Sequence, residues 1–127
     1  MAMKISSKVF AASTFFVSLI FLNSSTTIAA HLKETFLNPQ IEGKYIDACL
    51  NSFRFQDGCN KPAQNEVANQ FCRWRRYSSA IQWQSQDFGW KNRTINWKWT
   101  ERYTDGELQA NFFSNEGANR FTVIECR

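Results

Sequence analysis

Four cysteines are the residues of this chain whose chemistry is easiest to infer: Cys49, Cys59, Cys72 and Cys126. An even number of cysteines in a small chain from an oxidising compartment is typical of disulfides, here two. Zinc binding is the alternative, but no two of these cysteines have the close spacing of zinc ligands, and no histidine lies near them. We therefore expect two disulfides and no metal site.

The pairing of the cysteines is limited by a helix expected at residues 62–74. Cys59 precedes this helix and Cys72 lies near its end, so about ten helical residues separate them by roughly 15 Å. A disulfide needs Cα atoms within about 7 Å, which excludes Cys59–Cys72 and with it Cys49–Cys126. Two pairings remain. We favour Cys49–Cys59 with Cys72–Cys126, because the second bond would join the helix to the last strand, but Cys49–Cys72 with Cys59–Cys126 stays open.

Tryptophan is the next unusual feature, since all five tryptophans lie between Trp74 and Trp99. An exposed indole stacks on the apolar face of a sugar ring, and planar amides bond its hydroxyls. The residues that we expect to form such a site are Trp90, Trp97, Trp99, Gln82 and Gln84. The alternative is that Trp97 and Trp99 belong to the core. The ligand face would then be the opposite side of the same strand, with Asn96, Lys98, Thr100 and Arg102.

Catalytic groups are sparse in this sequence. His31 is the only histidine, so a nucleophile–histidine pair has a single candidate, and we expect no catalytic site. As a mature N-terminus His31 could bind copper, but the second histidine of such sites is missing. A carboxylate pair remains open as a third hypothesis, from Asp47, Asp57, Asp87, Glu101, Asp105 and Glu107. Phosphate-loop and calcium-loop motifs are absent from the sequence, and we expect no cofactor.

Residues 1–30 have the pattern of a secretory signal peptide. Lys4 and Lys8 precede an apolar run at 9–22, and small residues at 26–30 offer a cleavage site. The run is too short for a membrane anchor, which needs about 20 apolar residues. The sequence therefore predicts a secreted protein, extracellular or periplasmic, without a membrane association after cleavage. A formal net charge of +4 does not indicate a nucleic-acid partner, because the two leader lysines contribute to it.

The remaining chain is expected to form an irregular N-terminal arm at 31–44 and one domain at 45–127. Asn60 and Pro62 favour a helix start. An apolar stripe at helical spacing consists of Ala63, Val67, Phe71 and Trp74. Alternating apolar and polar residues predict antiparallel strands. The expected strands are 45–50, 80–86, 94–103, 108–112 and 121–126, and the expected loops and turns are 51–61, 104–106 and 114–119. These elements predict an α+β fold in which one helix packs on an antiparallel sheet cross-linked by two disulfides.

Several short motifs resemble a group of small secreted cysteine-rich proteins of plants and bacteria. The motifs are Ile46–Leu50, Cys59, Pro62-Ala63, Phe71–Arg73, Ala80 and Phe121–Cys126. The group typically has C-x-x-P-A-A-x-x-F-C followed by Gly and an aromatic residue. Here the segment from Pro to Cys is longer, Arg76-Tyr77 replaces the Gly-aromatic pair, and a later cysteine pair is missing. This resemblance implies no particular function.

The favoured cysteine pairing is also similar to that of the C-type-lectin-like fold. That fold joins a helix cysteine to the end of the last strand, and its long form adds an N-terminal pair about ten residues apart. Its Trp-Ile-Gly-Leu and Glu-Pro-Asn motifs are absent, so the similarity implies no calcium site and concerns architecture alone.

From these observations we expect a small secreted, non-catalytic binding module with a carbohydrate ligand. The alternative is a secreted effector or inhibitor that binds an extracellular protein through the loops 51–61 and 104–107 or 114–119. A small carboxylate-dependent hydrolase is the second alternative.

Overall fold

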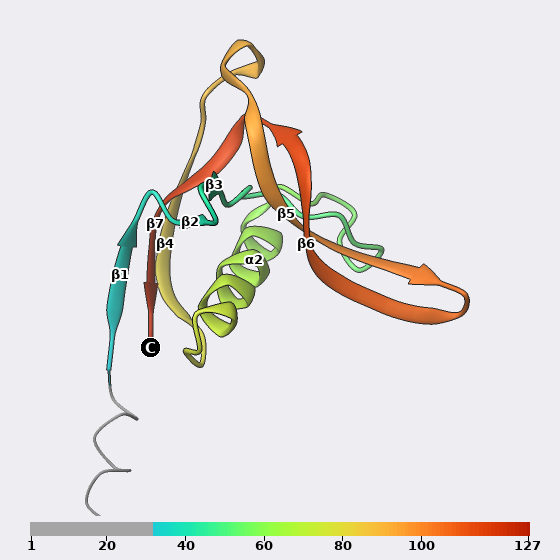
Figure 1. Cartoon of the computed structure of the whole chain (residues 1–127), viewed down its shortest axis with the longest axis horizontal. Coiled ribbons are helices and arrows are strands. Elements are labelled where there is room, and N and C mark those ends of the chain that lie inside the picture. The colour runs from blue at the N-terminus through green and yellow to red at the C-terminus, as the bar shows by residue number, and fades with distance from the viewer. Residues whose placement is uncertain (1–31) are drawn as a thin grey trace, which may run out of the picture. The chain divides into compact units, whose positions relative to one another are not determined.

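The computed structural model describes residues 32–127, which form an α+β fold with one α-helix and antiparallel sheets (Figure 1). The predicted signal peptide and His31 lie outside the described residues. Among residues 32–127, no helix has the length and apolarity needed to cross a membrane.

Helix α2 (Lys61–Trp74) begins where the sequence predicts. The Asn60 side chain accepts a hydrogen bond from the Ala63 amide at 2.9 Å, which satisfies one of the free N–H groups at the helix start. Pro62 occupies the first turn, where its missing N–H has no cost. The buried face of the helix consists of Ala63, Val67, Ala68, Phe71 and Cys72.

The helix packs on a three-stranded antiparallel sheet with the order β1-β7-β4. The strands are β1 (Glu34–Leu37), β7 (Asn119–Cys126) and β4 (Ala80–Asp87). Phe121 and Ile124 of β7 are fully buried in the core beside Phe71. Tyr77 and Trp83 pack against the edge of the same core.

The segment that we expected to be an irregular arm contributes strands instead. β1 pairs with β7, and β2 (Gln40–Ile41) pairs with β3 (Lys44–Tyr45) in a tight hairpin. The alternation that would reveal β1 is missing because only Phe36 turns inward, where its ring meets that of Phe71 edge-on at 5.1 Å. The predicted strand at 45–50 is correspondingly reduced to β3 and isolated bridges at Ile46 and Asp47.

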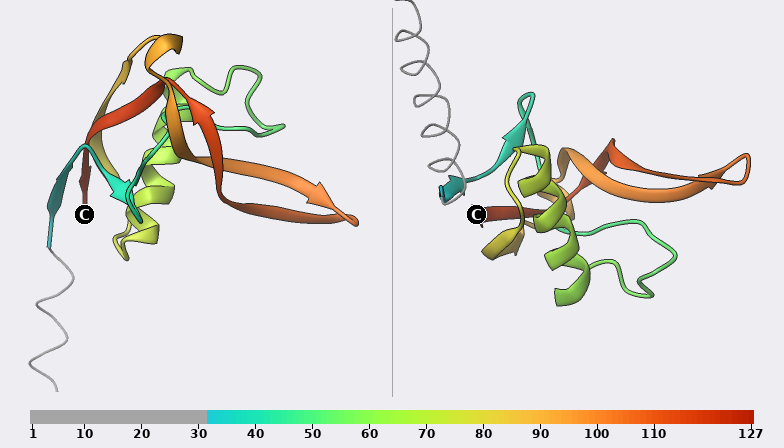
Figure 2. Two further views of the ribbon diagram at one scale, coloured as in Figure 1. Left: turned by 45° about the horizontal axis from the view of Figure 1, so that its top comes forward. Right: turned by 90° about the horizontal axis from the view of Figure 1, so that it is seen from below.

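Strands β5 (Thr94–Thr104) and β6 (Glu107–Gly117) form a long two-stranded ribbon, whose turn end extends away from helix α2 (Figure 2). The loop predicted at 114–119 was wrong. β6 continues to Gly117, and only Ala118 separates it from β7. The polar residues Ser114, Asn115 and Glu116 suggested a loop, but this ribbon leaves much of its surface in water and accepts polar side chains.

Both favoured disulfides are confirmed. Cys49 and Cys59 are joined with a Cα–Cα distance of 4.3 Å, and Cys72 and Cys126 with a distance of 5.5 Å. The second bond links helix α2 to the end of β7. Disulfides of this kind are typical of proteins from oxidising compartments.

Candidate functional site

Two clefts contain two of the five predicted ligand-binding residues, Trp90 and Trp97. The first, which we call the polar cleft, has a volume of about 260 Å³ and is lined by Asp47, Cys49, Cys59, Asp87, Trp90, Lys98, Glu116, Gly117, Ala118 and Asn119. The second, the aromatic cleft, has a volume of about 200 Å³ and is lined by Ile41, Glu42, Trp74, Trp97, Asn111 and Phe112.

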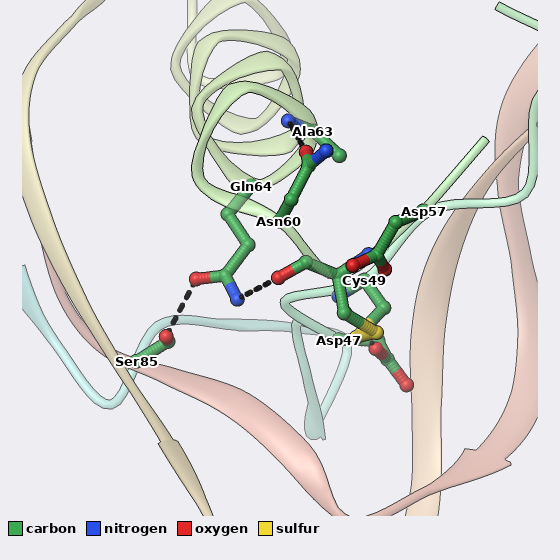
Figure 3. The surroundings of a disulfide bond; sticks show 8 residues. Asp47, Cys49, Asp57, Asn60, Ala63, Gln64 and Ser85 are labelled. Carbon is green, nitrogen blue, oxygen red and sulfur yellow. Dashed lines mark hydrogen bonds between the residues drawn. A yellow bond between two sulfur atoms is a disulfide. The ribbon is translucent and has the colours of Figure 1, made fainter. Parts of the chain in front are cut away.

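The wall of the polar cleft near helix α2 is the Cys49–Cys59 disulfide, and hydrogen bonds hold it in place. The Gln64 amide donates to the Cys59 carbonyl at 2.7 Å and accepts from the Ser85 hydroxyl at 2.6 Å, so α2 and β4 are both tied to it (Figure 3). Asp57 accepts from the Cys59 amide at 2.9 Å. These contacts make the disulfide a fixed wall.

Asp47 is the most deeply buried carboxylate of this cleft, with 2% of the residue exposed. It lies beside Cys49, whose amide donates to Asp47 Oδ1 at 2.9 Å (Figure 3). Burial raises the pKa of Asp47, while the Cys49 amide, the Lys98 charge and the Asn96 amide act in the opposite direction. Gly117 lies directly against this carboxylate and leaves room for it because glycine has no side chain. A Cβ at position 117 would lie 2.2 Å from Asp47 Oδ2.

Trp90 belongs to the short 3₁₀ helix η3 (Trp90–Asn92) and is 62% exposed. Asp87 fixes the preceding turn by accepting from the Gly89 amide at 2.8 Å. The Arg93 guanidinium lies over the indole at 4.8 Å from its centroid, donates to the Trp90 carbonyl and pairs with Glu116 at 3.3 Å. The indole is therefore solvent-accessible but supported by neighbouring groups.

The polar face of β5, our alternative ligand surface, is divided between different surroundings. Lys98 lines the polar cleft. Asn96 is fully buried; its amide donates to the Gly117 carbonyl at 3.2 Å, and its oxygen accepts from Thr94 at 2.6 Å. Arg102 lies farther along the ribbon, over the Phe113 ring at 4.4 Å. Thr100 is half-buried, and its hydroxyl donates to the Lys98 carbonyl at 3.3 Å.

The aromatic cleft is built by rings from different elements. Trp74 ends helix α2 and is 53% exposed, and its ring stands at 88° to that of Phe112 from β6. Trp97 is held by its indole N–H, which donates to the Ile41 carbonyl at 2.6 Å. Trp99 packs behind Phe112, with 5.1 Å between ring centroids.

The structure does not bring the five predicted sugar-binding residues together. Trp90 lines the polar cleft, Trp97 lines the aromatic cleft, and Trp99 packs against the core, as Trp97 also does. Gln82 and Gln84 are exposed on β4 and line neither cleft; Gln82 donates to Glu125 of β7 at 2.7 Å.

The residues that line the two clefts with Trp90 and Trp97 were not predicted from the sequence, because they come from distant segments. Asp47, Glu116 and Asn119 meet Trp90, and Glu42 and Trp74 meet Trp97. Trp74 was detectable as the end of the predicted apolar face of the helix, but its exposure was not.

Two of the six carboxylates that we considered for hydrolysis, Asp47 and Asp87, line the polar cleft. Within residues 32–127, no group of three His, Cys, Asp or Glu residues is placed to hold a metal ion. No protein-family model, curated protein or solved structure matches the chain. The functional argument therefore depends on the geometry of the two clefts.

Proposed function

We propose that this protein is a secreted carbohydrate-binding module and that the polar cleft is its sugar site. The observation that carries the proposal is the exposed indole of Trp90 at a cleft whose other walls hold charged hydrogen-bonding groups, among them Asp87, Lys98 and Glu116. The two disulfides support secretion, because such bonds persist in oxidising surroundings.

The chemistry of the walls matches the two sides of a sugar ring. The C–H face of a sugar stacks on an indole, while carboxylates accept hydrogen bonds from hydroxyls and an ammonium group donates them. A cleft of about 260 Å³ is smaller than the pockets of roughly 300–1,000 Å³ that enclose drug-sized ligands. We therefore propose that it takes one end of a glycan rather than a long stretch.

The charge of the cleft selects among sugars. Asp47, Asp87 and Glu116 line it together with Lys98, and Arg93 pairs with Glu116 beside Trp90, so the acidic groups exceed the basic groups by one. Sulfated or uronic-acid sugars would be repelled, and neutral or amino sugars favoured. This preference distinguishes a built site from nonspecific adsorption of a basic protein.

Binding is tested with the oxidised protein expressed from the full chain, on immobilised neutral, amino and sulfated glycans. Trp90→Ala should abolish retention, and Asp87→Asn, which keeps an oxygen for the Gly89 amide, should weaken it about tenfold, as expected for a lost charged hydrogen bond. Trp74→Ala is the matched control at the other cleft and should bind normally. Lack of retention on every glycan, or equal losses in the two tryptophan variants, would refute the sugar site.

The same assay tests the hydrolytic alternative. Product analysis of the bound glycan would reveal chain shortening, and a hydrolase that uses the pair Asp47 and Asp87 would lose it on Asp47→Asn. We expect intact glycan to be recovered.

One surface favours a second candidate function, binding to an extracellular protein. Phe53 and Tyr103 lie with ring centroids 5.3 Å apart and are 62% and 63% exposed, and Leu108, opposite Tyr103 in the ribbon, is also exposed. The Arg54–Glu101 pair holds the loop 51–61 against the ribbon, so Phe53 of that loop lies beside Tyr103, which directly precedes the predicted contact segment 104–107. This candidate predicts a stoichiometric complex that Tyr103→Ser disrupts and that free sugar does not.

A further inference from the structure

The aromatic cleft differs from the polar cleft in the kind of ligand that it suits. Its side chains provide three aromatic rings, of Trp74, Trp97 and Phe112, and a single charged group, the carboxylate of Glu42. The faces of aromatic rings attract cations, and cages of such rings with an acidic residue recognise alkylated ammonium groups. The remaining lining residues are Ile41 and Asn111, so the composition of this cleft is that of a cation site with one acidic group.

The rings are arranged as walls rather than as a flat patch. Trp74 stands nearly perpendicular to Phe112, with 6.4 Å between centroids, and Trp99 packs behind Phe112 at 74°. The hydrogen bond from the Trp97 indole to the Ile41 carbonyl fixes another wall. A rounded group that touches several rings at once fits such a corner better than a planar one.

Glu42 is placed at this cleft by an unusual turn. Glu42 and Gly43 have φ angles of 50° and 79°, as the two central residues of the tight turn between β2 and β3 require. Glycine or asparagine is preferred at both positions of such a turn. A glutamate there gives up some backbone stability, and it is one of the residues that line the cleft.

Trp97 already attracts a cation within the protein. The Lys44 ammonium lies 4.4 Å from the centroid of the Trp97 ring and donates to the Ser114 hydroxyl at 2.7 Å. This contact has the geometry of a cation–π interaction. It also places a positive charge near the cleft, which opposes a cationic ligand and which Glu42 offsets.

We propose that the aromatic cleft binds a trimethylammonium group. Its volume of about 200 Å³ admits a compact group of that kind. A permanent charge without N–H groups needs no hydrogen-bond acceptor, so Glu42 favours it through charge alone. The group occurs both in choline headgroups and in trimethylated lysine side chains. This inference is independent of the sugar site, because the two clefts share no lining residue.

The direct test is a titration of the oxidised protein with choline chloride, followed by the NMR signals of the tryptophan indole N–H groups, against sodium chloride at equal ionic strength. Choline should shift the signals of Trp74 and Trp97, with saturation in the millimolar range, and leave that of Trp90 in place. The neutral isostere 3,3-dimethylbutan-1-ol has the same shape without the charge, and it should bind at least tenfold more weakly.

Variants identify the walls. Trp74→Ala removes the most exposed ring and should weaken choline binding at least tenfold, Glu42→Gln should weaken it severalfold, and Lys44→Met should strengthen it by removing a like charge. Trp90→Ala is the matched control and should leave the affinity unchanged. Trp74 ends its helix and is half exposed, so its loss should not unfold the protein, which the dispersion of the NMR spectrum verifies.

Two further probes distinguish the source of the group: phosphatidylcholine vesicles and a peptide with trimethyl-lysine. The tighter of the two identifies the carrier. The proposal is overturned if choline fails to saturate any indole signal by 50 mM, if the neutral isostere binds equally well, or if Trp74→Ala retains full affinity. Glycan binding through Trp90 would be unaffected by any of these outcomes, so the two proposals fail separately.

Discussion

The Cys72–Cys126 disulfide should contribute more to the free energy of unfolding than the Cys49–Cys59 disulfide. Cys72 and Cys126 are separated by 54 positions, and Cys49 and Cys59 by 10. A cross-link restricts the unfolded chain more when it closes a longer loop. Cys72 and Cys126 are also fully buried, where the bond joins helix α2 to β7.

The separations convert into free energies through the loop-entropy relation. At 25 °C a loop of 54 residues corresponds to about 4 kcal/mol, and one of 10 residues to about 2.7 kcal/mol. A domain of this size has a total unfolding free energy of roughly 5–10 kcal/mol. Loss of the longer cross-link should therefore remove about half of the stability, and loss of both, about 7 kcal/mol together, should remove most of it.

The assay is urea unfolding, followed by tryptophan fluorescence, of three variants with paired Cys→Ala substitutions: Cys72/Cys126, Cys49/Cys59 and all four. Wild-type protein reduced with excess dithiothreitol is the control, because it loses the bonds without losing side-chain atoms. The reasoning is wrong if the Cys49/Cys59 variant is destabilised as much as the Cys72/Cys126 variant. It is also wrong if full reduction leaves the unfolding midpoint unchanged.

Two carboxylates should give opposite pH dependence to stability, which urea unfolding from pH 3 to pH 8 would measure. The Arg54 guanidinium lowers the pKa of Glu101, so this pair stabilises the fold above the unfolded pKa of glutamate and loses its effect as the pH falls through the lower folded value. Because Arg54 is half exposed, Glu101→Gln should cost only about 1 kcal/mol at pH 7 and nothing at low pH; an equal cost at both ends would contradict the pairing. Burial raises the pKa of Asp47, so its ionisation opposes folding as the pH rises through that raised value. Asp47→Asn keeps the acceptor for the Cys49 amide, and its stability relative to the wild type should increase as the pH rises. A difference in stability that is the same at every pH would show that burial does not raise the pKa of Asp47.

The fold was predictable where local patterns were strong. The cap at Asn60, the proline in the first turn and the apolar spacing of residues 63–71 all agree on helix α2, because local geometry and burial favour the same structure there. Strand β5 was predicted from the alternation of its residue types, but its burial does not follow that alternation, since Asn96 is buried and Ile95 and Tyr103 are exposed. β1 and the end of β6 were missed because their side chains are mostly exposed, so their strand conformation depends on pairing with β5 or β7 rather than on a buried face.

The candidate site was predictable only residue by residue. Trp90 and Trp97 were expected at a ligand site, but the sequence did not indicate that they belong to different clefts. The tight turn that carries Glu42 was hidden in a segment interpreted as an irregular arm. Gln82 and Gln84 have the right chemistry for sugars but lie away from both clefts, on the exposed side of β4.

The sequence by itself determined the helix, the positions of the longer strands and the exclusion of a Cys59–Cys72 disulfide. Each of these depends on geometry over a few neighbouring residues. Only the tertiary structure decided which acids meet which tryptophans. Asp47 and Glu116 lie far apart along the chain, yet both line the cleft with Trp90. Asp47 bridges to Arg120 of β7, and Glu116 of β6 pairs with Ile95 of β5, five residues after Trp90. A contact between distant residues depends on strand order and register, and these follow from packing of the whole core rather than from any local pattern.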